Sequence, residues 1–300
     1  MTAVLPGRSA AHSPRIRHLQ TIGLLAPAAA AFLWLYAGVL SGLARQWASD
    51  ENYSHGFLVV PLAAFFAWER RGALARATIR PSLSGIAVVA GSLLLFLIGT
   101  FGADLFLTRI SLVGVLAGTI LFLAGWAYLR LLVFPLGFLL LMVPLPSIVF
   151  NQITFPLQLL ASQAGELVIS AAGVPVLREG NILQLPTRTL EVAEACSGIR
   201  SLVSLLMMAI VLGHFSGGGT VRRIVIAAAA IPIAIVANAL RVAGTGLAAA
   251  WISPAAADGF FHSFTGWVAF VVACGALLAF QCSLARRPMA RLRLAVGASR

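Results

Sequence analysis

The stretch IVIAAAAIPIAIVANALRVAGTGLAAA, from Ile224 to Ala250, decides the class of fold. It is almost wholly apolar and holds a single ionisable side chain, Arg241. A helix needs about 20 apolar residues to cross the hydrocarbon core of a bilayer, so this stretch predicts a transmembrane helix. An ionisable side chain inside such a helix is costly and is a candidate functional residue by default.

The same pattern recurs along the whole chain. Hydrophobic residues make up 60% of the 300 positions, charged residues make up 10%, and the mean hydropathy is +0.97. A soluble domain is nearer half apolar and a quarter charged. We therefore predict an all-α integral membrane protein with about eight transmembrane helices. Besides the stretch quoted above, the candidates are Ile22–Ala44, Asn52–Trp68, Leu83–Phe101, Leu105–Leu129, Leu131–Phe150, Ser197–His214 and Ser263–Leu284.

The arginines orient these helices, because short cytoplasmic loops are enriched in basic residues. The segment Asn52–Trp68 is short and starts with polar residues, so its status decides the topology of everything after it. If it crosses, 15 of the 21 basic residues lie inside, whereas Glu69 is the single acidic residue there. If it does not cross, the bias is largely reversed. We therefore predict eight crossings with both termini in the cytoplasm. The inside arginines are Arg8, Arg15, Arg17, Arg70, Arg71, Arg76, Arg80, Arg130, Arg222, Arg223, Arg286, Arg287, Arg291, Arg293 and Arg300.

The first apolar segment is expected to stay in the protein. Ile22–Ala44 is too long for a typical signal-peptide core, and no clear small-x-small cleavage site follows it. The chain then divides into a basic cytoplasmic N-terminus (1–21), one polytopic membrane domain (22–284) and a basic cytoplasmic tail (285–300).

Charge and cysteine usage exclude several classes of function. The net charge of +12 would suit a nucleic-acid partner, but the charges are segregated by membrane side and form no basic face, so we exclude nucleic acid. Cys196, Cys274 and Cys282 form no CxxC motif and no paired framework, which argues against a disulfide scaffold and a structural zinc site. We find no metal-ligand spacing and predict neither a metal nor a cofactor.

The one long loop, 151–195, is predicted to lie outside. Its first part, Ile153–Ala172, is predicted to be an amphipathic helix on the outer surface, and Gly173-Val-Pro then stops that helix. Alternating apolar residues around Pro186-Thr-Arg-Thr189 predict a small β-hairpin that leads into Cys196. The apolar residues at helical spacing are Leu157, Leu160, Ala164, Leu167 and Val168, and the alternating ones are Leu183, Leu185, Leu190 and Val192.

Three side chains suited to catalysis converge at the outer face. Cys196 stands at the outer start of the sixth helix, Arg241 lies in the outer half of the seventh, and His262 opens the eighth. A thiol at a helix N-terminus near an arginine is expected to be partly thiolate. A thiolate attacks an amide carbonyl, an imidazole protonates the leaving amine, and an arginine stabilises an oxyanion or holds a substrate carboxylate. The set therefore indicates acyl transfer from a peptide.

Each of these residues also has an ordinary structural interpretation. A buried cysteine is often a small hydrophobic residue, and Cys274 and Cys282 match that description. Arg241 can be an arginine that snorkels, and His262 can be an interfacial histidine. The convergence of the three at one depth favours function.

Five further residues are candidate supporting groups. Arg200 shares a helix face with Cys196 at i, i+4, and we favour a structural pair with Glu194 over direct catalysis. Asn238 and Thr245 form one polar stripe with Arg241, at i, i+3 and i+7. The fifth residue, His55, is at the outer face in the Tyr53-Ser-His-Gly56 segment, and we interpret it as a residue that either supports the catalytic groups or is purely structural.

The depth of Arg241 depends on how regular its helix is. In a regular helix Arg241 lies about 15 Å below Trp251. Gly244 and Gly246 would leave Arg241 shallower if they made that end of the helix irregular.

The residues around these positions resemble the exosortase family of bacterial membrane transpeptidases. The matching segments are Glu194-Ala-Cys-Ser-Gly-Ile-Arg200, Asn238-Ala-Leu-Arg-Val242 and Phe261-His-Ser-Phe-Thr-Gly-Trp267, in that order. Upstream, Tyr53-Ser-His-Gly-Phe-Leu58, Val143-Pro-Leu-Pro146 and Arg178-Glu-Gly-Asn181 look like further family signatures. Together they extend over most of the chain. The chain is similar in particular to the exosortase A type, which is found in Gram-negative bacteria with exopolysaccharide loci.

This resemblance implies an activity, a partner and a location. Exosortases are thought to process exported proteins that carry a C-terminal sorting signal, which is a Pro-Glu-Pro motif, a transmembrane segment and a basic tail. The family's proposed catalytic residues map onto Cys196, Arg241 and His262. The resemblance implies a thiol protease of the bacterial inner membrane with its site facing the periplasm. The substrate tail would enter beside the last three helices, and water or an amine would resolve the acyl-enzyme.

Two other functions stay open on the sequence. One is a non-peptidase membrane component that transfers acyl groups or glycans in exopolysaccharide assembly. The other is a non-catalytic scaffold or transporter subunit. Transporters usually show paired repeats and broken helices in both halves, whereas the polar residues here cluster in the last three helices.

Overall fold

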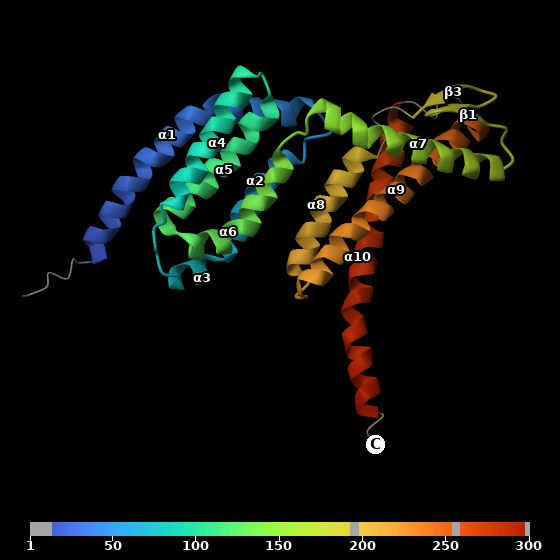
Figure 1. Cartoon of the computed structure of the whole chain (residues 1–300). Coiled ribbons are helices and arrows are strands. Elements are labelled where there is room, and N and C mark those ends of the chain that lie inside the picture. Colours follow the sequence, from blue (N-terminus) through green and yellow to red (C-terminus); the bar gives the residue numbers. More distant parts are fainter. Residues whose placement is uncertain (1–13, 193–197, 254–258, 298–300) are drawn as a thin grey trace, which may run out of the picture. The chain divides into compact units, whose positions relative to one another are not determined.

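The structure is a computed structural model that describes residues 14–192, 198–253 and 259–297 (Figure 1). Side chains are described for residue 27 and for residues 29–192, 198–253 and 264–284. Contacts divide the chain into two compact units. The first comprises the chain up to Ser49 together with Ala64–Leu136, and the second comprises Asp50–Ala63 and the chain from Gly137 onward.

The first unit is helical. Its helices are α1 (Pro14–Ser49), α3 (Arg71–Arg76), α4 (Ser84–Phe101) and α5 (Leu105–Ala124), with the later part of α2 (Gly56–Glu69) and most of α6 (Trp126–Leu139). Its centre is the hairpin of α4 and α5. A Cβ atom on Gly85 would lie 2.3 Å from the backbone nitrogen of Phe122, and one on Gly118 would lie 2.8 Å from that of Val89. Small residues thus allow the two backbones to approach closely, as is common between membrane helices.

The turn of this hairpin is capped by a side chain. Asp104 accepts hydrogen bonds at Oδ1 from the backbone nitrogens of Phe106 (2.8 Å) and Leu107 (3.2 Å). These donors belong to the first turn of α5 and have no partner within the helix. The carboxylate therefore fixes where α5 begins.

The second unit combines a small sheet with four long helices. After the 3-10 turn η1 (Leu140–Met142) come α7 (Ser147–Ala171), β1 (Leu177–Glu179), β2 (Ile182–Gln184), β3 (Thr189–Glu191), α8 (Ile199–Phe215), α9 (Thr220–Trp251) and α10 (Gly259–Gly297). The strands form an antiparallel sheet in the order β1-β2-β3, with Leu183 opposite both Arg178 and Leu190. Figure 1 shows α7 and the sheet at the end of this unit where α8 and α10 begin and α9 ends.

Two apolar clusters hold the second unit together. One joins α7, the sheet and the last turns of α9, around Ile169, Leu183, Val192 and Val242. The other joins α8, the first half of α9 and α10, around buried residues such as Leu205 and Leu277. The site described below lies between these clusters, on the middle of α9.

The membrane-protein fold with a small β element is confirmed. In the described residues, four helical segments are long and apolar enough to span a bilayer: Ser84–Phe101, Leu105–Ala124, Thr220–Trp251 and Phe264–Leu284. A bent pair, Trp126–Met142 with Ser147–Ala171, passes the same test together, and Gly56–Glu69 and Ile199–Phe215 are shorter apolar helices. The count of eight crossings and the division at residues 21 and 284 stay predictions.

Two of the predicted spans are interrupted within their predicted bounds. Leu131–Phe150 is not one straight helix, because the chain bends by 80° between Met142 and Ser147. Pro144 and Pro146 lie in that bend, and proline removes a backbone donor and clashes with the preceding helical turn. The predicted helix Leu105–Leu129 ends at Ala124, since Gly125 takes a left-handed φ of +89° against the carbonyl oxygen of Arg80.

The predicted amphipathic helix is present, but it starts earlier and is turned unexpectedly. It begins at Ser147 instead of Ile153. Its buried face carries small and polar side chains, whereas Leu160, Leu167 and Val168 are exposed. Three of the five residues of the predicted apolar stripe are therefore exposed, whereas Leu157 and Ala164 are partly buried. The buried residues are Thr154, Gln158, Ala161, Ser162, Gly165 and Ile169.

The predicted hairpin is β2–β3, and the structure adds β1 to it. Gly180, with a φ of +65°, and Asn181 form the two-residue turn between β1 and β2. Glycine at the first position of such a turn adopts this conformation without steric cost. The third strand was missed because Leu177–Glu179 has too few residues for a visible alternation.

Candidate active site

The three predicted catalytic residues are placed to different extents. Arg241 is half-buried near the middle of α9. His262 lies in the first turns of α10, where the backbone is described. Cys196 and the supporting residue Glu194 lie outside the described residues. The contacts of the residues next to them in the chain define the site.

The start of α8 is packed tightly against α9. Gly198, two residues after Cys196, is the N-cap of α8 and has a left-handed φ of +76°. A Cβ atom there would lie 2.7 Å from Cγ of Asn238, a side chain that is only 5% exposed. Both the backbone conformation and the available space therefore require glycine. This contact fixes Gly198, the first described residue after Cys196, against Asn238 of α9.

The start of α10 meets α9 one turn further on. A Cβ atom on Gly266 would lie 3.0 Å from Cζ of Arg241 and 3.1 and 3.2 Å from two of its nitrogens. The guanidinium group therefore lies against the backbone of α10 at Gly266. His262 precedes Gly266 by four residues, so it belongs to the same face of α10, one turn closer to the helix start.

One stripe on α9 thus contacts both neighbouring helices. Asn238 meets the start of α8, and Arg241 meets the start of α10. The third residue of the stripe, Thr245, is buried one turn further along α9. Because α9 is continuous from Thr220 to Trp251, Gly244 and Gly246 do not make its end irregular, and Arg241 lies about 15 Å along the axis from Trp251.

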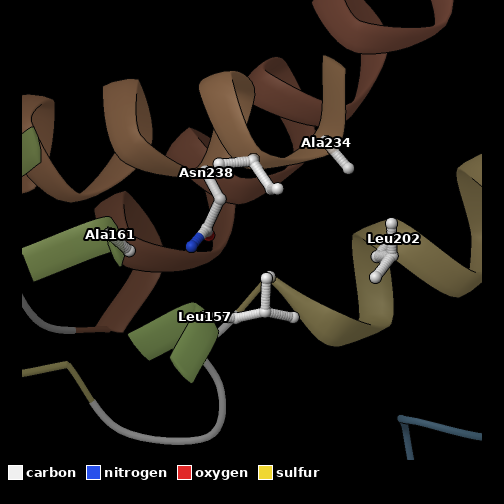
Figure 2. Close-up of a pocket in the computed structure, with 7 residues that line it drawn as sticks. Leu157, Ala161, Leu202, Ala234 and Asn238 are labelled. Carbon is white, nitrogen blue, oxygen red and sulfur yellow. The ribbon is translucent and has the colours of Figure 1, made fainter. Parts of the chain in front are cut away.

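A small cavity lies beside the contact between Gly198 and Asn238. It has a volume of about 10 Å³ and is lined by residues of α7, α8 and α9, which is near the lower limit for one water molecule. Figure 2 shows the amide of Asn238 turned from α9 into this space, with Leu157 and Ala161 of α7 on one side and Leu202 of α8 on the other. The space between α7, α9 and the start of α8 is therefore nearly filled by side chains.

The predicted supporting residue Arg200 has a partner that the sequence analysis did not find. Its Nη1 atom lies 2.5 Å from Oε2 of Glu51. Glu194 lies outside the described residues, so the predicted pair with Glu194 stays a prediction. Glu51 is 149 positions away in the chain, and no local spacing points to it. Both side chains are well exposed, so the pair orients the first turn of α8 more than it stabilises the fold.

His55 is held in the turn that carries Glu51. Its Nε2 atom donates to the carbonyl oxygen of Leu141 at 3.1 Å, and its ring lies 6.4 Å from that of Tyr53. Burial lowers the pKa of His55, partly opposed by its backbone hydrogen bonds, so the ring is neutral at pH 7. These contacts connect His55 to the end of η1, and its supporting role stays a prediction.

The strand that leads to Cys196 is anchored by the Arg178-Glu-Gly-Asn181 segment. Asn181 donates from Nδ2 to the carbonyl oxygen of Val192 (3.3 Å), and its own carbonyl accepts from the nitrogen of Val192 (2.8 Å). Arg178 pairs with Glu166 of α7 at 2.8 Å. The sheet is thereby fixed to α7 on one side and holds the chain four residues before Cys196 on the other. The sequence analysis noted this segment without a role for it.

No cluster of three or more His, Cys, Asp or Glu residues that could hold a metal ion occurs in the described part of the chain. The polar groups at the site are those of an arginine and an asparagine, which act by hydrogen bonding and charge. The arrangement is that of a multi-pass helical membrane protein with a polar site where three apolar helices meet.

Comparison with known proteins gives the family. The family model described as "Transmembrane exosortase" matches residues 47–279. The chain therefore belongs to the transmembrane exosortase family, an enzyme family that acts on proteins with PEP-CTERM sorting signals. Neither the curated proteins nor the solved structures contain a match to the chain.

Proposed function

We propose that this chain is a membrane cysteine transpeptidase of the exosortase A type, which cleaves C-terminal Pro-Glu-Pro sorting signals of exported proteins at the periplasmic face of the inner membrane. One observation carries the assignment of residues. On α9, Asn238 contacts Gly198, two residues after Cys196, and Arg241 contacts Gly266, one turn after His262. Both contacts lie on one stripe of α9, and this supports the proposal that Cys196 and His262 act together.

The proposed reaction has two steps with a common intermediate. The Cys196 thiol proton passes to His262, and the thiolate forms a bond to a backbone carbonyl carbon near the Pro-Glu-Pro motif. The C–N bond then breaks, and His262 gives its proton to the leaving amine. In the second step an amine or water attacks the thioester, His262 accepts the proton of that nucleophile, and the C–S bond breaks to restore the thiolate.

Arg241 has two roles compatible with its position. Its guanidinium group can stabilise the oxyanion that forms during each attack, or it can bind the carboxylate of the motif's glutamate through two hydrogen bonds. A double change separates them. If Arg241 binds the glutamate, a Pro-Gln-Pro substrate and the Arg241→Gln variant each lower turnover, and together they lower it little further. If Arg241 stabilises the oxyanion, the two losses multiply.

The direct test of the proposal is cleavage of a tagged substrate. We would co-express the full chain with an exported protein that ends in a Pro-Glu-Pro motif, a transmembrane segment and a basic tail, and follow its size by immunoblot. Cleavage is expected with the wild type and with Cys282→Ala, whose thiol is exposed elsewhere on the chain. No cleavage is expected with Cys196→Ala or Cys196→Ser. Full processing by Cys196→Ala would overturn the thioacyl mechanism.

A further inference from the structure

An apolar groove runs along the contact between α9 and α10. It has a volume of about 280 Å³, and every side chain that lines it is apolar. Its floor is made of small residues, Ala237 on α9 and the buried Ala273 on α10. Its two edges are exposed, with Val236 and Leu240 on α9 and Val272 on α10, each between 57% and 60% exposed.

The shape of the groove suits an apolar helix better than separate acyl chains. Contacts between membrane helices are built on small residues that let the backbones approach closely, with larger side chains at the edges. An alanine floor between two valine and leucine edges has this form. The groove extends from Pro232 to Leu240 on α9, which is about 12 Å, or a little over two turns of helix.

The groove ends at the level of the candidate active site along α9. Leu240, at one end of the groove, is the residue before Arg241. On the other wall, Val272 follows Gly266 by six residues, about 9 Å along α10. A helix that lies in the groove and extends toward the end of α9 therefore reaches the level at which Arg241 contacts α10.

We propose that this groove docks the transmembrane segment of the substrate, immediately after its sorting motif. The inference rests on the proposed function, because it takes the substrate to be a protein whose apolar segment follows the cleaved motif. The motif then lies near Arg241, and the first two turns of the apolar segment lie between Val236, Leu240 and Val272. The substrate helix then runs antiparallel to α9. If one substrate position lies near Leu240, the position four residues later in the substrate lies near Val236.

Two neighbouring valines provide a matched test. Val271 and Val272 are both exposed on α10, at 47% and 60%, but only Val272 lines the groove, and successive residues point about 100° apart on a helix. We would place a photoreactive phenylalanine analogue at each position in the full chain carrying Cys196→Ala, and irradiate membranes that contain the tagged substrate. Cross-linking to the substrate is expected from Val272 at about ten times the yield from Val271.

The register provides a second measurement. The same analogue at Leu240 and at Val236 should label substrate positions about four residues apart, the later one from Val236. Equal labelling from Val271 and Val272, labelling of lipid alone, or labelling of a second copy of this chain would each overturn the inference. A register that runs in the opposite direction would overturn the antiparallel placement.

The cross-linking results test the groove independently of the thioacyl mechanism. Cross-linking in the Cys196→Ala background needs no turnover, so it can succeed even if the thioacyl mechanism is wrong. Conversely, Val272→Trp in the active chain is expected to slow processing about tenfold while Val271→Trp does not. Unchanged processing by Val272→Trp, with wild-type amounts of protein in the membrane, would remove the groove from the mechanism and leave the peptidase proposal intact.

Discussion

The α4–α5 hairpin of the first unit and the α8–α9–α10 cluster of the second both depend on close contacts at glycine, but the glycines touch different things. In the hairpin, Gly85 and Gly118 lie against the backbone of Phe122 and Val89. In the second unit, Gly198 and Gly266 lie against the polar side chains of Asn238 and Arg241. Glycine thus serves packing in the first case and positions polar groups in the second.

The polar side chains of the two regions also have different kinds of partner. In the hairpin, Ser92 and Thr108 donate to carbonyl oxygens of their own helix, those of Val88 (2.7 Å) and Leu105 (2.9 Å). Such bonds satisfy the hydroxyl donors within their own helix. On α9, the stripe of Asn238 and Arg241 is directed at neighbouring helices. Ser111 of α5 is an exception in the first unit, since its hydroxyl also contacts the hydroxyl of Tyr36 on α1 at 2.9 Å. A polar contact between helices therefore does not by itself indicate a site.

The largest expected effect is on turnover, from the second unit. Arg241→Gln should lower substrate processing by about 10²- to 10³-fold, the loss that follows removal of one oxyanion donor, with little change in the amount of folded protein. The control is Arg223→Gln on the same helix, which should keep wild-type processing. Immunoblots of substrate and enzyme in the same membranes measure both. Equal losses in the two variants would mean that Arg241 is a structural arginine.

The next effect is on the start of α8. Gly198→Ala should destabilise the second unit, because a left-handed residue with a Cβ atom costs about 1–2 kcal/mol and because that atom would overlap Asn238. Gly173→Ala is the matched control, since Gly173 has a φ of +81° and nothing within 4 Å of its Cβ position. Thermal unfolding in detergent should show the larger loss for Gly198→Ala. Equal losses would mean that the contact with Asn238 adds nothing.

A smaller effect sharpens the comparison of the two regions. Gly266→Ala should shift the Arg241 guanidinium by a few tenths of an ångström and lower turnover about tenfold, with little loss of stability because the guanidinium can move. Gly118→Ala in the hairpin should lower the stability and leave turnover almost unchanged, because its Cβ atom would lie 2.8 Å from the backbone nitrogen of Val89. Gly275→Ala, with open space around its Cβ position, should change neither. A loss of stability without loss of turnover in Gly266→Ala would contradict the assignment.

The smallest effect concerns pH. Because burial lowers the pKa of His55, the folded state binds fewer protons than the unfolded state. The stabilising contribution is therefore present above the unfolded pKa of about 6.5 and is lost as the pH falls toward the lower, folded pKa. The melting temperature of the wild type should fall more between pH 7 and pH 5 than that of His55→Gln. Parallel curves for the two proteins would show that His55 does not contribute to the pH dependence.

Sequence alone determined the class of fold and the position of the polar stripe. Long apolar runs are sufficient to predict membrane helices, since a helix satisfies its own backbone groups whatever surrounds it. The spacing of Asn238, Arg241 and Thr245 places them on one face of α9 for the same reason, and the helix is continuous as that spacing requires. The exosortase resemblance was also readable from short motifs, and the family match confirms it.

Tertiary structure alone decided which neighbours these groups meet. The pairing of Arg200 with Glu51 and the contact of Arg241 with Gly266 join residues that are far apart in the chain, and such contacts depend on how helices cross. The sequence also did not show that Leu160, Leu167 and Val168 of α7 are exposed. A periodic pattern shows that a helix has two faces but not which of them packs on the protein. Local geometry is set by neighbours in sequence, whereas a site is set by neighbours in space.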